Sequence, residues 1–257
     1  MNSLKICIYL DSYERYTFFS RFVAAFEELG VEFAFCSNRL GVLKQLKARK
    51  WTALEIQRND EFKIPLDLDL SNSLEALAYG LSSDCIDQLS SASYSFLEKY
   101  GKDFHCFFAW NGENVFSQCL RHFSQSRQDF QTLFFEISNL PGKLFVDPKG
   151  TNRSSSIFLD PSVLDDYLVD EKDFLKWSSN YSAEKKKQVS IPQVKKSKPN
   201  YLAYIYDYLG FASGLYPKDT LLSIEKMLSV FRSAPVKKSN FKLADNRDCL
   251  LYTSDAA

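Results

Sequence analysis

Acidic and basic side chains follow two short apolar runs in the middle of this sequence. Residues 133–135 have the pattern of a strand buried on both faces, and they lead directly to the carboxylate of Glu136. Residues 144–146 form a second run, which ends at Asp147 and continues into a polar turn that contains Lys149. Ligands of open α/β sheets bind beyond the carboxyl ends of strands, so both acids are predicted to face one crevice.

These residue types suit the transfer of a sugar. Glycosyl transfer passes through a cation-like sugar, which a carboxylate stabilises or traps, while cations and N–H groups hold the leaving phosphate. Glu136 and Asp147 are predicted to be catalytic, because burial alone would favour apolar residues at those places. Asp160 is a third candidate acid, although Asp before Pro161 is also normal at the start of a helix. The candidate substrate contacts in this stretch are Lys149, Gly150, Asn152 and Arg153.

A second polar turn follows a continuous aromatic run at residues 103–110, which predicts a buried strand. The turn contains Asn111, Gly112 and Glu113, and a helix is predicted to begin near Asn114. The free N–H groups of that helix would open next to the strand end and could hold an anion. Two interpretations stay open: the turn binds substrate, or it is a tight turn followed by an Asn114 cap.

Several well-known site motifs do not occur in this sequence. No GxGxxG follows the first predicted strand, and there is no GxSxG, HExxH or Walker loop. Neither His105 nor His122 has a partner at ligand or triad spacing, so no histidine-based hydrolase and no metal site is predicted. Apart from Cys249, the cysteines are scattered without CxxC spacing and are expected to be buried thiols.

The composition is that of an ordinary folded protein. The chain has 257 residues, 45% of them hydrophobic and 25% charged, which is enough to bury a substantial core. Lys+Arg and Asp+Glu are equal at 32 each, so no nucleic-acid partner is expected. The 22 Phe and 14 Tyr are interpreted as core packing. A cytoplasmic location is predicted, since neither a secretory signal pattern nor an apolar run of about 20 residues occurs.

Strands and helices are predicted to alternate along the first half of the chain, which indicates an α/β fold with a Rossmann-like parallel sheet and flanking helices. Apolar runs predict further strands at residues 4–10, 31–36 and 51–57. Apolar residues three and four apart predict helices at 14–29, 37–50, 73–100 in one or two pieces, and 114–123.

The second half of the chain is predicted to be less regular. Acidic and apolar residues alternate at 161–176, which favours an amphipathic surface helix over a metal site. A Ser- and Lys-rich stretch predicts a flexible basic linker, with peripheral contact to the inner face of a membrane as the alternative. Residues 249–257 resemble a translated sequencing adapter and are set aside. The predicted domains are a Rossmann-like domain at 1–177, the linker at 178–200, and the helical start of a truncated second domain at 201–248.

The stretch FFEISNLPGKLFVDPKGTN, residues 134–152, resembles a segment of bacterial capsular-polysaccharide synthesis proteins and of the related transferases of the acidic sugar Kdo. The segment in that family has the form F-F-E-x-x-x-L-P-x-x-x-x-V-D-P-x-G-x-N. The resemblance is clearest over residues 104–160 and extends back to residue 1. Ile137 and Ser138 stand where many members carry Gly after the acid, which leaves the identity of the sugar open.

That resemblance implies the N-terminal half of a two-domain, GT-B-like glycosyltransferase of surface-polysaccharide synthesis. The implied donor is CMP-Kdo or a related sugar nucleotide, with no other cofactor, and the implied acceptor is a polysaccharide or a lipid-linked glycan. Members of this class hold the nucleotide mainly on their C-terminal half, so this chain alone is expected to be inactive. Two alternatives stay open: a non-catalytic capsule assembly or export protein that binds glycan or a partner enzyme, and an enzyme that uses UDP or GDP donors.

Overall fold

One sheet organises the computed structural model, which describes residues 3–26, 29–127, 130–138, 143–165, 167–186 and 201–220. The strand order is β3-β2-β1-β4-β5-β6, with β1 to β5 parallel and β6 antiparallel to β5. The predicted α/β class with a mostly parallel, Rossmann-like sheet is therefore confirmed. The strands are β1 (Lys5–Tyr9), β2 (Glu32–Ser37), β3 (Ala53–Glu55), β4 (Cys106–Trp110), β5 (Gln131–Ile137) and β6 (Leu144–Asp147).

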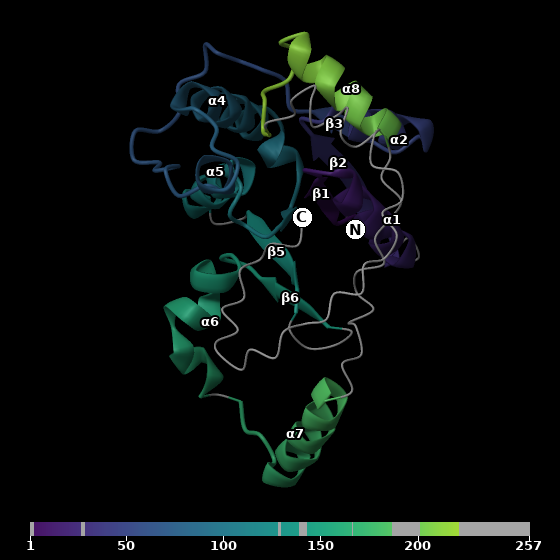
Figure 1. Ribbon diagram of the computed structural model, residues 1–257, viewed down its shortest axis with the longest axis vertical. Helices are drawn as coiled ribbons and strands as arrows, with labels where there is room; N and C mark the ends of the chain where they lie inside the picture. The colour runs from purple at the N-terminus through teal and green to yellow at the C-terminus, as the bar shows by residue number, and fades with distance from the viewer. Residues whose placement is uncertain are drawn as a thin grey trace, which may run out of the picture.

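Helices cover both faces of this sheet, with α1 and α2 on one side and α4 and α5 on the other (Figure 1). Successive side chains of a strand point to opposite faces, so β1 contributes to both layers. Ile6 and Ile8 pack with α1 and α2, while Cys7 and Tyr9 pack with α4 and α5. The helices are α1 (Tyr13–Phe26), α2 (Leu40–Ala48), α3 (Leu74–Leu77), α4 (Ser83–Tyr100) and α5 (Val115–Gln125).

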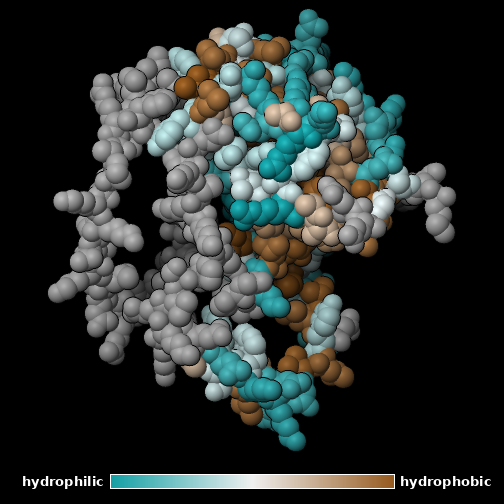
Figure 2. All heavy atoms as spheres, turned by 90° about the vertical axis from the view of Figure 1, so that its right-hand side faces the viewer, coloured by the Kyte–Doolittle hydropathy of each residue, from teal (hydrophilic) through white to brown (hydrophobic). Residues whose placement is uncertain are grey.

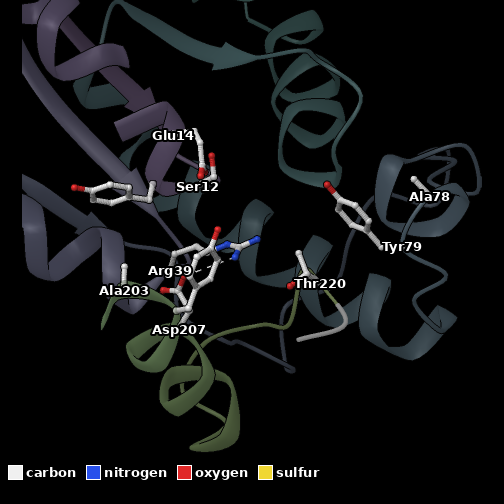
Figure 3. Close-up of a pocket in the computed structure, with 10 residues that line it drawn as sticks. Ser12, Glu14, Arg39, Ala78, Tyr79, Ala203, Asp207 and Thr220 are labelled. Atoms are coloured by element: carbon white, nitrogen blue, oxygen red, sulfur yellow. Dashed lines mark ion pairs between the residues drawn. The ribbon is translucent and has the colours of Figure 1, made fainter. Parts of the chain in front are cut away.

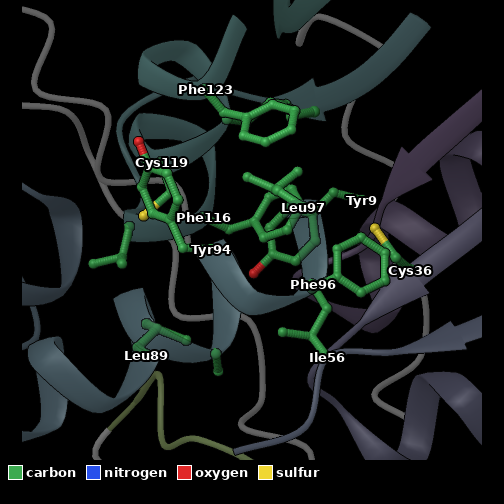
Figure 4. Close-up of a cluster of buried hydrophobic side chains, with 14 of the residues drawn as sticks. Tyr9, Cys36, Ile56, Leu89, Tyr94, Phe96, Leu97, Phe116, Cys119 and Phe123 are labelled. Atoms are coloured by element: carbon green, nitrogen blue, oxygen red, sulfur yellow. The ribbon is translucent and has the colours of Figure 1, made fainter. Parts of the chain in front are cut away.

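Aromatic side chains hold these layers together. Phe19 of α1 is fully buried and meets Trp110 and Phe135 edge to face, with ring centroids 6.2 and 5.5 Å apart. On the other face Tyr9 stacks on Phe116 at 4.0 Å (Figure 4). Such pairs contribute about 0.5–1.5 kcal/mol each beyond the burial of their area. The interpretation of the aromatic residues as core packing is therefore confirmed.

The strands and helices predicted up to residue 147 agree with the observed ones apart from their ends and two details. The predicted helix at 73–100 is divided into α3 and α4, because the Ser82 hydroxyl caps a new helix by accepting from the Cys85 N–H at 3.4 Å. The second detail is the direction of β6. It returns beside β5, so Asp147 pairs with Phe134 in the middle of β5 instead of ending at the carboxyl edge of the sheet.

The chain after β6 extends away from the sheet (Figure 1). The helix predicted at 161–176 is wrong, because Asp160 caps a short 3-10 turn and the longer helix begins only after Asp170. The Asp170 side chain caps that helix by accepting from the Lys172 and Asp173 N–H groups at 2.8 and 3.2 Å. The predicted linker is also corrected, since its first residues belong to α7, whereas residues 187–200 lie outside the described part. The elements here are η3 (Asn152–Ser154), α6 (Ser156–Leu159), η4 (Pro161–Leu164) and α7 (Glu171–Lys186).

Apolar side chains of this extension face solvent, and Figure 2 shows them among hydrophilic residues in the lower part of the molecule. Leu168 is 98% exposed and Phe158 is 66% exposed. Exposed apolar surface of this kind is typical of contacts with a partner. Within the ranges that the structure describes, no helix has the length and apolar character needed to cross a bilayer.

Helix α8 (Tyr201–Ala212) packs on α2 (Figure 1). The two helices approach so closely that a Cβ on Gly41 would lie 2.3 Å from the Ala203 carbonyl oxygen. Asp207 of α8 accepts a hydrogen bond from the Gly41 N–H at 2.7 Å. The segment predicted to begin a second domain thus lies on the first one. The second domain itself stays a prediction, since residues 221–248 lie outside the described part.

The substitution Gly41→Ala tests this close approach. We expect the free energy of unfolding in urea to fall by about 1–2 kcal/mol, because overpacking costs about 1–3 kcal/mol and outweighs the gain of up to about 1 kcal/mol in helix propensity. Ala48→Ser, at an exposed position of the same helix, is the control and should change stability by less than about 0.5 kcal/mol. Equal stabilities of both variants and the parent would show that α8 does not pack here.

Candidate functional site

Loops that follow four parallel strands meet at the carboxyl edge of the sheet. The strand order reverses between β1 and β4, since β1 continues to β2 and β4 continues to β5 on the opposite side. Ile8 pairs with Phe108, and β1 and β4 end one and two residues after that pair, so the loops that follow them leave the sheet at the same edge. This edge is the switch point at which open α/β sheets bind ligands.

The turn at 111–113, Glu136 and the loop at 147–156 come together at this edge, and we call them the edge cluster. The loop folds back from β6 over the ends of β4 and β5, so residues distant in sequence become neighbours. The structure therefore brings together the two predicted polar turns and the first predicted acid. The joining hydrogen bonds run from Thr151 Oγ1 to the Asn111 carbonyl, from Ser154 Oγ to Glu113 Oε1 at 2.9 Å, and from Asn152 Nδ2 to Glu136 Oε2 at 3.1 Å.

Two glycines leave room at the centre of the edge cluster. Gly112 has φ +84°, and a Cβ there would lie 3.2 Å from Arg121 Nη2. A Cβ on Gly150 would lie 2.9 Å from the same nitrogen and 2.7 Å from the Ser154 Cβ. Both substitutions would press on one guanidinium, so glycine is required at these positions by packing as well as by backbone conformation.

That guanidinium belongs to Arg121, which the sequence analysis did not select. Its Nη2 donates to the Gly112 carbonyl at 2.7 Å and lies 3.9 Å from Glu113 Oε1. Burial lowers the pKa of Arg121, against the attraction of Glu113. Its Nε is buried without a hydrogen-bond partner among the described residues, which leaves one N–H for a ligand. Arg121 follows the Asn114 cap by seven residues, two helical turns, and this spacing is the signal that could have found it.

Asp147 acts on the loop that follows it. Its side chain is 4% exposed and accepts four hydrogen bonds. With both oxygens occupied in this way, Asp147 is well suited to fix the loop and poorly suited to attack a sugar. The donors are the N–H groups of Lys149 at 2.8 Å and Gly150 at 3.2 Å, and the N–H and hydroxyl of Ser156 at 2.9 and 3.1 Å.

The other candidates differ in how they face the edge cluster. Glu136 is half-buried on β5, and within the described residues Asn152 is its one hydrogen-bond donor. The side chains of Lys149 and Arg153 are exposed at the rim. Asp160 is exposed and caps η4, and hydrogen bonds from Ser162 lower its pKa. The structure thus leaves Glu136 as the acid with free capacity and places Asp160 outside the cluster.

Glu75 is a buried acid that sequence reasoning missed. It is 3% exposed on α3, and its Oε2 accepts from the Val115 N–H at the start of α5 at 2.9 Å. Burial raises the pKa of Glu75 to about 8, so the carboxyl is mostly protonated at neutral pH. The Leu74 N–H donates to the Glu113 carbonyl at 2.9 Å, which places this acid next to the edge cluster.

His122 has partners in space that its sequence spacing does not reveal. Its Nε2 lies 3.1 Å from Asp67 Oδ2, and its Nδ1 is hydrogen-bonded to the Tyr94 hydroxyl. Burial raises the pKa of Tyr94, so this tyrosine is a poor nucleophile. Among the described residues, no group of three or more His, Cys, Asp and Glu side chains could hold a metal ion.

A pocket of about 450 Å³ opens at the ends of β1 and β2 (Figure 3). The sequence around Ser12 is typical of a helix cap, and the Ser12 hydroxyl does cap α1 by accepting from the Arg15 N–H at 3.3 Å. α8 and the segment after it close the pocket, so its position depends on contacts that span most of the described chain. The pocket is lined by Ser12, Tyr13, Glu14, Arg39, Ala78, Tyr79, Ala203, Tyr204, Asp207 and Thr220.

Arg39 anchors this closure. It is 8% exposed and contacts Asp219 at 3.0 Å and Asp207 at 3.6 Å. Burial disfavours its charge, but Asp219 and Asp207 outweigh that effect and raise the pKa of Arg39. Burial raises the pKa of Asp207 to about 6, although the attraction of Arg39 opposes this shift. Asn38, predicted to cap a helix, instead donates to Asp219 at 2.9 Å.

The fold and the edge cluster define a class, an α/β protein with a Rossmann-like sheet and a cluster of polar residues at its carboxyl edge. No protein-family model matches this chain, and no significant match to it was found among curated proteins or solved structures. The function is therefore argued from the two sites at this edge.

The substitution Asp147→Asn separates a structural acid from a free one. We expect it to lower the free energy of unfolding by about 2 kcal/mol, because the NH₂ group of the Asn side chain would face N–H and O–H donors of the loop instead of accepting from them. Glu136→Gln is the matched comparison and should shift stability by less than about 0.5 kcal/mol. Urea denaturation at pH 7 measures both. A larger loss for Glu136→Gln than for Asp147→Asn would reverse these assignments.

Glu75 makes stability depend on pH. Because the pKa is about 8 in the folded chain and about 4.3 in an unfolded one, the folded state binds the proton more tightly and stability falls as pH rises through this window. Asp207 acts in the same direction, but its pKa of about 6 confines most of its effect to lower pH. Urea denaturation from pH 6.5 to 8 should show this decline, and Glu75→Gln should flatten it. Glu61→Gln, at an exposed site, should keep the decline. Identical slopes for all three proteins would show that Glu75 is ionised when buried.

Proposed function

We propose that this protein is a glycosyltransferase of surface-polysaccharide synthesis, with a GT-B-like architecture, which transfers Kdo or a related sugar from a CMP-activated donor to a glycan or glycolipid. The observation that carries the proposal is the environment of Glu136. This acid is half-buried at the carboxyl edge, retains capacity to accept hydrogen bonds, and lies beside a loop that presents cations. Stabilising or trapping a cation-like sugar requires such a carboxylate.

The cations of the edge cluster suit the negative charges of such a donor. Lys149 and Arg153 are exposed at the rim, where they can meet the phosphate or the sugar carboxylate. Arg121 lies deeper and keeps one buried N–H without a partner among the described residues. Developing charge is stabilised best by donors that are already in place, and Arg121 is held in place by Gly112 and Glu113.

The acids then divide between two roles. Glu136 acts as the nucleophile or as the stabiliser of the cation, while Asp147 shapes the loop that carries Lys149 and Asn152. Asp160 caps η4 and takes no part in the chemistry. Asn111, Gly112 and Glu113 position the substrate through the turn that Arg121 supports.

A second candidate function is that of a non-catalytic assembly protein that binds glycan or a partner enzyme. The exposed apolar side chains of the extension, such as Phe158 and Leu168, favour it because they are typical of interaction surfaces. Such a protein would bind glycan without forming product, so a transfer assay separates the two functions.

The substitution Glu136→Gln tests the proposal. Transfer is measured with CMP-Kdo, UDP-sugar and GDP-sugar donors and a lipid-linked acceptor, using this chain and the longer protein if the reading frame extends further. With CMP-Kdo we expect product from the longer protein that includes the C-terminal half, because this chain alone is expected to be inactive. In that protein kcat should fall by about 100-fold in the variant, as found when a group that stabilises transition-state charge is removed. Glu171→Gln, at an exposed position of α7, should retain the parent rate. Unchanged transfer by Glu136→Gln, or product from a UDP or GDP donor alone, would contradict the proposal.

A further inference from the structure

The pocket at the ends of β1 and β2 is separate from the edge cluster, and none of the transfer chemistry above uses it. Its volume of about 450 Å³ lies within the range of about 300–1,000 Å³ that is typical of small-molecule sites. Its lining comes from α1, the end of β2, the segment after α3, and α8 with the residues that follow it. A pocket built from four segments beyond the carboxyl ends of parallel strands is placed to receive a ligand.

Charges of both signs line the pocket and disfavour a ligand with a net charge. An anion would meet Glu14 and Asp207, and the Arg39 charge that might attract it is already paired with Asp207 and Asp219. A cation would meet the Arg39 guanidinium, which lines the same space (Figure 3). Like charges at such distances are costly when they are shielded from water. A ligand without net charge avoids repulsion both from the acids and from the arginine of the lining.

The remaining lining combines hydroxyl groups with aromatic rings. Ser12 and Thr220 supply hydroxyls, and Tyr13, Tyr79 and Tyr204 supply both a ring and a hydroxyl. Hydroxyls donate and accept hydrogen bonds, and aromatic rings pack against C–H groups. A sugar offers both surfaces, since its hydroxyls project around a ring whose faces carry C–H groups.

Thr220 gives a second and independent observation that points to a ligand. Its Oγ1 atom is buried and has no hydrogen-bond partner among the described residues. An unsatisfied buried hydroxyl costs about 1–3 kcal/mol, and a water molecule or a ligand can supply the partner. A hydroxyl of a bound ligand is such a partner.

We infer that this pocket binds a neutral sugar unit. The identification of that unit as part of the acceptor rests on the proposed transfer function, whereas the binding itself does not. The pocket and the edge cluster share the carboxyl edge of the sheet, because β1 and β4 are parallel neighbours. A neutral sugar in the pocket would therefore lie at the same edge as the cations that hold an anionic donor.

Saturation-transfer NMR on the 257-residue chain tests the inference with methyl glycosides of glucose, galactose and N-acetylglucosamine and with their disaccharides. N-acetylneuraminic acid and CMP serve as the anionic probes. We expect a neutral glycoside to bind and neither anion to displace it. Tyr79→Phe and Thr220→Val should each weaken binding about tenfold, while Tyr167→Phe, which changes a tyrosine that is 73% exposed outside the pocket, should not.

Thermal unfolding shows whether the Thr220→Val variant is still folded. Removing an unpartnered hydroxyl should leave Tm unchanged or raise it, so weaker sugar binding by a folded variant reports the pocket itself. Failure of every neutral glycoside to bind, displacement by N-acetylneuraminic acid, or unchanged affinity in both pocket variants would overturn the inference.

Transfer and binding can fail separately. A longer protein with the C-terminal half that binds neutral sugars through Thr220 and Tyr79 but forms no product retains this inference and loses the proposed function. A chain that transfers sugar, with acceptor binding untouched by Tyr79→Phe and Thr220→Val, retains the function and loses the inference.

Discussion

The buried charge of Arg39 is the constraint on which much of this structure depends. A guanidinium taken out of water needs close partners, and loss of one partner of such a pair costs about 3–5 kcal/mol. Its partners, Asp207 and Asp219, lie about 170 to 180 residues further along the chain, within 3.6 and 3.0 Å. The need to pair this charge stabilises α8 on α2, and α8 in turn closes the pocket at the ends of β1 and β2. One electrostatic requirement thus joins residues far apart along the described chain and closes a pocket between them.

Carboxyl groups along the same edge take different roles because their surroundings differ. Asp147 is buried and surrounded by hydrogen-bond donors, so its oxygens are occupied by hydrogen bonds that hold a loop in place. Glu75 is buried beside one N–H group, and desolvation keeps it largely protonated at neutral pH. Glu136 is half-buried with one described donor, which leaves it able to meet positive charge on a ligand. Residue type alone does not separate these three acids, whereas burial and hydrogen bonding do.

The two sites at the carboxyl edge are complementary in charge. The edge cluster presents Arg121, Lys149 and Arg153, which suit an anionic group, while the pocket balances Arg39 against acids and suits a neutral one. Both lie where the loops of neighbouring strands converge, because parallel strands direct all their carboxyl ends to one edge. A protein that joins an acidic sugar to a neutral glycan needs this kind of division.

The sequence by itself determined the alternation of strands and helices, the parallel sheet and the aromatic core. Those features follow from local patterns, since apolar periodicity and chain order already limit how a sheet can be wound. Only the tertiary structure decided the return of β6, the saturation of Asp147, the place of Arg121 and the closure of the pocket by α8. Each of these depends on hydrogen bonds or ion pairs between residues distant along the chain, and such contacts leave no periodic signal in the order of the amino acids.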